Sequence, residues 1–262
     1  MSNYKEKKTR TKTREEVIST INKYGLLNGV GIRHFGESRE CEHFIWFLEN
    51  GKIESYESPD AYIKIDNQVL IIEHFSIDGF DTYPNGGSKL QQYESKTDKE
   101  FRDIPVTKPF EFCITQPQIA NSYEGFINNC RDKFEHHYKR ISKYKEHLLT
   151  ENIANENTKF TTCFLIDEVS PLGTLTYDGK NTHPVNLACS KEFLDYFCTK
   201  PDVDWIVSAI VRLPDPGFYP YFFSQKDIEF CNKKVLNYAD FQFISMENME
   251  DIRYRIIISK ED

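Results

Sequence analysis

Two short apolar stretches joined by a turn constrain the fold of this chain more than any other part of it. Residues 61–65 (AYIKI) and 69–73 (VLIIE) are rich in β-branched and aromatic side chains. Between them stands a turn-type sequence, Asp66-Asn67-Gln68. This pattern predicts a β-hairpin.

The register of this hairpin brings two carboxylates together. If Asp66 and Asn67 form the two-residue loop, Asp60 lies directly opposite Glu73, whereas a loop of Asn67 and Gln68 moves Glu73 to the neighbouring diagonal. Both registers leave the two acids on one face. Like charges about 5 Å apart across a ladder are destabilising, so one carboxyl stays protonated unless a cation lies between them. We therefore expect Asp60 and Glu73 to bind a divalent metal ion, Mg²⁺ or Mn²⁺.

The same stretch resembles the PD-(D/E)XK nuclease superfamily. The matching residues are Pro59-Asp60 at a strand start and, thirteen positions after the Asp, Ile71-Ile72-Glu73. A polar, glycine-containing link over residues 78–88 follows, and then KLQQYESK, which is similar to the Gln- and Tyr-bearing helix that often follows the core strands in that superfamily. The resemblance covers residues 13–105 by motif and the rest of the chain by element order.

One position departs from the superfamily pattern. The superfamily places a Lys two residues after the Glu, on the same strand face, and Phe75 stands there in this chain. His74 lies between them, but alternation directs it to the other face. We expect Lys89, at the start of the following helix, to supply the missing basic group, because a cation beside the metal stabilises the charge that develops on the phosphate.

The resemblance also implies assisting residues outside the hairpin. Gln92 belongs to the helix after the link, and a Glu of the first helix often assists the metal site, which makes Glu15 and Glu16 candidates. Glu16 has a second interpretation, since Thr13 and Glu16 form a capping box at a helix start. The catalytic set implied is thus Asp60, Glu73 and Lys89, with Asp60 and Glu73 as the metal ligands.

The order of elements predicts an α+β fold with a restriction-endonuclease-like mixed central sheet, flanked by helices, and an elaborated C-terminal half. Residues 43–48 and 52–56 flank an Asn-Gly turn, so we expect four adjacent strands at 43–48, 52–56, 60–66 and 69–75. Residues 1–12 are expected to form a flexible basic N-terminus, and residues 13–262 a single nuclease-like domain.

The C-terminal half adds a long amphipathic helix, two buried strands and short loops. Apolar residues step by three and four over 122–149, and the basic outer faces of this helix either line a nucleic-acid groove or form a solvated surface. We interpret His136 and His137 as surface histidines. The strands are expected over 159–169 and 203–211, with Asp167-Glu168 as a surface pair, because the chain has no GxxxxGK[ST] phosphate loop.

Four further features complete the predictions for this half. A polar loop is expected over 171–184, and a helix capped by Ser190 follows it. The aromatic run 214–223 is either a core-capping loop or a recognition surface. A terminal hairpin closes the chain.

Composition excludes several classes of protein. The net charge of −8 argues against a protein that coats polyanions in general. Seven cysteines without a CxxC pair do not form a disulfide or zinc framework. Because no apolar run reaches the length of a membrane span, we expect a soluble cytoplasmic protein without a membrane partner.

These observations leave three functional hypotheses. The first is a metal-dependent nucleic-acid phosphodiester hydrolase, acting on DNA rather than RNA. The second is a catalytically degenerate nuclease-like module that binds nucleic acid or protein, because Phe75 replaces the Lys. The third is another α+β protein whose two acids face solvent. The sequence leaves the oligomeric state open, a dimer included.

Overall fold

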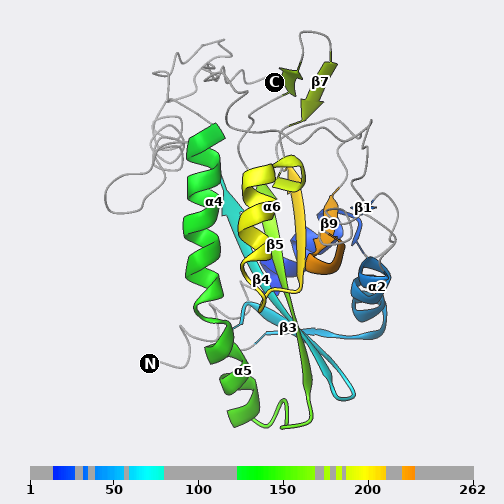
Figure 1. The fold of residues 1–262 in the computed structure, drawn as a ribbon. Helices are drawn as coiled ribbons and strands as arrows, with labels where there is room; N and C mark the ends of the chain where they lie inside the picture. Colours follow the sequence, from blue (N-terminus) through cyan, green and yellow to red (C-terminus); the bar gives the residue numbers. More distant parts are fainter. Residues whose placement is uncertain are drawn as a thin grey trace, which may run out of the picture.

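The computed structural model describes residues 14–26, 32–34, 39–55, 59–79, 123–168, 174–177, 181–184, 187–210 and 220–227. These residues form an α+β fold in which helices flank a mixed seven-stranded sheet of order β1-β9-β8-β5-β4-β3-β2 (Figure 1). The basic N-terminus, the 89–96 helix and the terminal hairpin predicted from the sequence lie outside the described residues. No helix among those described is long and apolar enough to cross a bilayer.

The sheet combines an antiparallel meander with parallel strands. Strands β2, β3 and β4 pair antiparallel in sequence order, β4, β5 and β8 run parallel, β9 returns antiparallel to β8, and β1 lies parallel to β9. A separate hairpin joins β6 and β7. The strands are β1 (Arg33–His34), β2 (Ile53–Glu54), β3 (Ala61–Ile65), β4 (Gln68–Ile77), β5 (Lys159–Glu168), β6 (Thr174–Tyr177), β7 (Asn181–Pro184), β8 (Trp205–Ile210) and β9 (Tyr221–Ser224).

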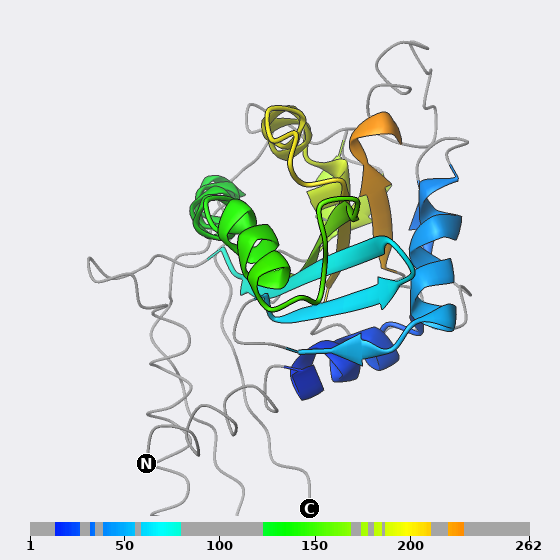
Figure 2. The ribbon, with the colours of Figure 1, turned by 90° about the horizontal axis from the view of Figure 1, so that it is seen from below.

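Helices cover both faces of the large sheet. Figure 2 shows α4 and α5 (green) on one side of β3 and β4, and α2 (blue) on the other. The helical segments are residues 14–23, α2 (Glu40–Asn50), α4 (Tyr123–Tyr138), α5 (Ile141–Thr150), the short 3₁₀ helix η2 (Leu187–Cys189) and α6 (Lys191–Cys198). Ser190 caps α6 as predicted, and its hydroxyl accepts the Phe193 N–H at 3.2 Å.

Two aromatic cores hold these layers together. Phe134, Phe164 and Phe193 pack between the sheet and helices α4 and α6. On the other face, Trp205 and Phe44 pack edge to face between the sheet and α2. Each fully buried large side chain contributes about 1.5–3 kcal/mol, so the cores fix the positions of α4 and α2 against the central strands.

The central hairpin predicted from the sequence is confirmed. The register pairs Ala61 with Ile72 and Ile65 with Gln68, which makes Asp66 and Asn67 the two-residue loop. Asp66 has a φ of 50°, a left-handed conformation that Asp tolerates in tight turns. Strand β4 is apolar because it lies between β3 and β5 and is covered on both faces.

The hairpin predicted over 43–56 is wrong, because its first half is the helix α2. Cys41, Phe44, Phe47 and Leu48 are buried, and their spacing by three, three and one gives the helical stripe that faces the sheet. The predicted Asn50-Gly51 turn ends this helix instead of joining two strands. Within the described part of the predicted second strand, residues 52–55, Ile53–Glu54 pair with β3.

Two predictions for the C-terminal half also need correction. The predicted long helix is divided into α4 and α5 by a turn at Lys139-Arg140, where the Arg140 N–H donates to the carbonyl of His137, three residues back, instead of to the carbonyl four residues back as in an α-helix. The predicted loop 171–184 contains the β6–β7 hairpin. The buried strands are confirmed as β5 and β8, and Tyr221 to Phe223 of the aromatic run are core residues of β9.

Candidate functional site

The two predicted metal ligands lie together at the open end of the β3–β4 hairpin. Asp60 directly precedes β3, and the register continues from the Ala61–Ile72 pair to place it opposite Glu73. The Asp60 N–H donates to Glu73 Oε1 at 3.1 Å, and the His74 N–H donates to Asp60 Oδ2 at 2.9 Å. Each carboxylate is therefore oriented by a backbone amide of the opposing segment.

Glu73 is held by two side chains from the helices that follow it. Its side chain points between the sheet and α4–α5, and the residue is only 2% exposed. Nδ1 of His137, on α4, lies 2.6 Å from Glu73 Oε2, and the hydroxyl of Tyr144, on α5, donates to the same oxygen at 2.9 Å. Burial and then the charge of Glu73 raise the pKa of Tyr144, which keeps this hydroxyl a donor.

The surroundings of the acid pair shift the pKa of Asp60. Burial, and next the charge of Glu73, raise the pKa of Asp60 to about 6, while the His74 amide and the nearby His137 act in the opposite direction. This is the repulsion expected of two carboxylates at adjacent ladder positions. A cation beside Asp60 would relieve it.

Phe75 stands two residues after Glu73, on the same face of β4. Its ring is buried and stacks on the imidazole of His137, with centroids 4.7 Å apart and planes 10° apart. Phe164, on β5, packs edge to face against the Phe75 ring, with centroids 5.7 Å apart. The space over residue 75 is thus occupied by a side chain of α4.

The opposite face of β4 carries a second polar cluster. Nε2 of His74 lies 3.3 Å from Asp167 Oδ2 and 3.4 Å from the Thr20 hydroxyl, and the Tyr24 hydroxyl donates to Asp167 Oδ1. Burial and then Asp167 raise the pKa of Tyr24. The cluster joins the N-terminal helix to β4 and β5, and it has no contact with the carboxylate of Glu73 because the sheet separates them.

The prediction that Asp167 and Glu168 form a surface pair is wrong. The Asp167 side chain is 14% exposed and belongs to the cluster with His74. Glu168 is 1% exposed, on the opposite face, where it accepts the Leu187 N–H at 3.1 Å. Burial raises the pKa of Glu168 to about 8, although the Leu187 N–H lowers it. Both acids are structural because helices cover both faces at the end of β5.

The two remaining predicted site residues that the structure describes, Glu15 and Glu16, are separate from the acid pair. Glu15 and Glu16 are exposed on the N-terminal helix. Lys89 and Gln92 lie outside the described residues. Among the residues that are described, no three His, Cys, Asp or Glu side chains gather as a metal-binding group.

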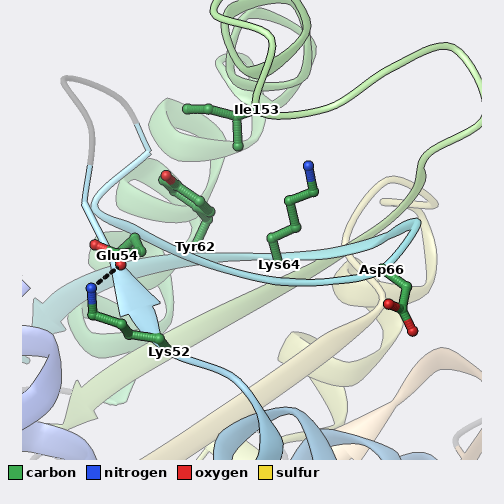
Figure 3. A pocket seen from close by; sticks show the side chains of 6 residues that line it. All are labelled: Lys52, Glu54, Tyr62, Lys64, Asp66 and Ile153. Carbon is green, nitrogen blue, oxygen red and sulfur yellow. Dashed lines mark ion pairs between the residues drawn. The ribbon is translucent and has the colours of Figure 1, made fainter.

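A surface hollow lies further along the same hairpin. It has a volume of about 480 Å³ and is lined by Lys52, Glu54, Tyr62, Lys64, Asp66 and Ile153 (Figure 3). Lys52 pairs with Glu54, and Lys64 is exposed on β3. The hollow contains none of the residues around Glu73, so we do not assign it to the acid pair.

Sequence reasoning missed the two side chains that bind Glu73. The prediction that His137 is a surface histidine is wrong, because its side chain is 17% exposed and its Nδ1 lies against the buried carboxylate of Glu73. Tyr144 is a buried residue of α5 and fits the apolar stripe predicted over 122–149, but that stripe gives no indication of the role of its hydroxyl. A buried Glu on an apolar strand is the one available signal, because such a group requires partners.

Comparison of the chain with protein-family models, with curated proteins and with solved structures gives no match in any of the three.

Proposed function

We propose that the chain is a metal-dependent nucleic-acid phosphodiester hydrolase with a restriction-endonuclease-like core. The observation that carries the proposal is the pairing of Asp60 with Glu73 at the start of the β3–β4 hairpin. The order of the elements around this pair supports the proposal: a helix, the β2–β4 meander, the helices α4 and α5, and β5 parallel to β4. The resemblance to the PD-(D/E)XK superfamily favours DNA over RNA as the substrate.

The two carboxylates fit a hard divalent cation. Mg²⁺ is commonly bound by one or two carboxylates and keeps several waters, so a set of two acids is sufficient. Oδ1 of Asp60 accepts no hydrogen bond from any described residue, whereas Oδ2 is held by the His74 amide. Asp60 and Glu73 would therefore hold Mg²⁺ or Mn²⁺, which when bound supplies polarisation of the phosphate and a lowered pKa of the attacking water.

Hydrolysis requires that the chain orient its acids and keep them ionised. The oxygen of water bonds to phosphorus as the bond to the leaving ester oxygen breaks; one water proton goes to the leaving oxygen and the other to the new phosphate monoester or solvent. Asp60 is oriented by the His74 amide, and Glu73 by Asp60, His137 and Tyr144. Phe75 and Phe164 cover the apolar side of this group.

Substitution of either acid tests the proposal. We expect Asp60→Asn and Glu73→Gln to weaken Mn²⁺ binding at least tenfold by calorimetry, and to slow cleavage of linear and single-stranded DNA about 100-fold or more, because each removes a ligand charge. Glu49→Gln, an exposed acid at the end of α2, is the matched control. Unchanged Mn²⁺ affinity and stoichiometry in both site variants would refute the metal site.

A catalytically degenerate module that binds nucleic acid or protein is the second candidate. Phe75 in place of Lys favours it, as does the engagement of Glu73 Oε2 by both His137 and Tyr144. This candidate predicts DNA binding that the wild-type protein does not follow with cleavage in either Mg²⁺ or Mn²⁺. Fluorescence anisotropy with a labelled oligonucleotide, run beside the cleavage assay, separates the two.

A further inference from the structure

The turn between α4 and α5 connects the two residues that lie against Glu73. Arg140, in this turn, donates its backbone N–H to the carbonyl of His137 at 3.0 Å and accepts the Tyr144 N–H at 3.0 Å. Its backbone is helical, with φ −97° and ψ −11°. The side chains of His137 and Tyr144 both reach Glu73 Oε2. Because residues three and four positions apart share one side of a helical segment, Arg140 lies on the side that faces the acid pair.

The guanidinium of Arg140 lies beside the Tyr144 hydroxyl. Burial and then the charge of Glu73 raise the pKa of Tyr144, whereas the charge of Arg140 and a hydrogen bond from its side chain lower it. A phenol oxygen can accept one hydrogen bond while its O–H donates another, so Tyr144 links the guanidinium to the Glu73 carboxylate. A permanent cation therefore stands one hydroxyl group away from the acid pair.

Arg140 keeps most of its donors available to a ligand. The residue is exposed, and none of the residues that the structure describes forms an ion pair with it. A guanidinium has five N–H donors, and the Tyr144 oxygen needs only one of them. Four other basic side chains of α4 and α5 are engaged within the protein: Arg131 with the Glu192 carbonyl, Lys133 with the Ser76 carbonyl, Lys139 with Glu135 and Lys145 with Asp202.

We propose that Arg140 binds the phosphate of a nucleic-acid strand that lies against the Asp60–Glu73 pair. The inference rests on the proposed hydrolase function, for which it names a substrate contact. The two carboxylates repel a phosphodiester, and a guanidinium beside them offsets part of this repulsion. Its planar fork matches two oxygens of one phosphate and stays charged over the whole physiological pH range. The contact with Tyr144 orients the fork before the strand binds, so less side-chain entropy is lost.

Loss of the guanidinium tests this contact without metal and without cleavage. A fluorescein-labelled single-stranded DNA oligonucleotide is titrated with protein in EDTA at several salt concentrations, and its anisotropy gives the affinity. We expect Arg140→Gln to weaken binding about tenfold at low salt, the effect of losing one charge-assisted contact. The slope of log affinity against log salt should fall by about 0.7, the value for one phosphate of a single strand. Arg140→Lys should keep the slope and lose part of the affinity, because the charge remains and the fork does not.

The matched control removes one positive charge from the other face of the sheet. Lys23→Gln does so at an exposed position of the N-terminal helix, whose Val17 and Ile21 pack on that face. Its affinity and salt slope should equal those of wild type, which excludes an effect of net charge alone. An effect of Arg140→Gln that is only structural would lower the affinity and leave the slope unchanged, and that result contradicts the inference.

The outcomes separate this inference from the hydrolase proposal. Unchanged affinity and slope in Arg140→Gln, or no oligonucleotide binding by the wild-type protein in EDTA, overturns the role of Arg140. The hydrolase is judged separately, by Mn²⁺ binding and cleavage in Asp60→Asn and Glu73→Gln. Wild-type protein that binds the oligonucleotide without cleaving it refutes the hydrolase, and a lowered slope in Arg140→Gln then still supports the phosphate contact. Displacement of the oligonucleotide by poly-glutamate at equal charge concentration would contradict recognition of phosphate.

Discussion

At the scale of single residues, the buried acids Glu73 and Glu168 differ in the partners that surround them. Glu73 accepts hydrogen bonds from the Tyr144 hydroxyl and the Asp60 amide, and His137 Nδ1 lies 2.6 Å from its Oε2. Glu168, at the end of the neighbouring strand, has no cation beside it among the described residues, and its pKa is raised to about 8. The partners of an acid thus distinguish the candidate catalytic group from the structural one.

The raised pKa of Glu168 makes stability depend on pH. The folded protein binds a proton at Glu168 that the unfolded chain has already released above its usual pKa of about 4.3. The contribution of Glu168 to the free energy of unfolding is therefore complete below pH 4 and decreases as the pH rises toward 8. We expect Glu168→Gln to be more stable than wild type at pH 9 by about 2–5 kcal/mol, and this advantage to decrease toward pH 5.

Urea unfolding of both proteins between pH 5 and pH 9 measures this difference. The Gln amide oxygen retains an acceptor for the Leu187 N–H, so the comparison isolates the charge. A stability difference that is constant across this pH range would show that the protonation of Glu168 is not coupled to folding.

At the scale of elements, local chemistry determined what the sequence could predict. The β3–β4 hairpin was predictable because the Asp66-Asn67 turn and the β-branched strands lie within one short stretch. HFIWFL, residues 43–48, is apolar enough for a strand, and only its packing against the sheet gives it a helical face as part of α2. The contact of His137 with Glu73 joins residues 64 positions apart and depends on how α4 docks, which no local pattern encodes.

The junction between α2 and the hairpin depends on Gly51. A Cβ at this position would lie 2.1 Å from Ile63 Cγ2 and 2.9 Å from the Phe47 carbonyl oxygen. We expect Gly51→Ala to lower the free energy of unfolding by about 1–3 kcal/mol, because the branched Ile63 side chain cannot move without disturbing β3. The exposed Glu49→Ala should change it by less than about 0.5 kcal/mol.

A double-mutant cycle with Ile63→Ala identifies the cause of this loss. The cost of Gly51→Ala should decrease when Ile63 is already Ala, since the closest contact is then removed. Equal costs in the two backgrounds would instead assign the loss to the Phe47 carbonyl or to the backbone of the helix end.

At the scale of the whole molecule, β4 connects the two helical layers through neighbouring residues. Glu73 binds α4 and α5 on one face, and His74 meets Asp167 and Thr20 on the other. The backbone of His74 also holds Asp60, so the acid pair lies where both layers are attached. The N-terminal helix is attached by Val17, Ile21 and the Tyr24 hydroxyl.

Removal of the Tyr24 hydroxyl tests whether this attachment depends on the polar cluster as well as on apolar packing. We expect Tyr24→Phe to lower the free energy of unfolding by about 1–3 kcal/mol, because Asp167 loses a donor in a partly buried site. Hydrogen exchange should accelerate in residues 14–23 and remain slow in β4, which β3 and β5 protect on both sides. Lys23→Ala, exposed on the same helix, is the control. An unchanged exchange rate in residues 14–23 would mean that the apolar packing of Val17 and Ile21 is sufficient to hold the N-terminal helix against the sheet. The contacts with His74 and Asp167 would then not be needed for its position.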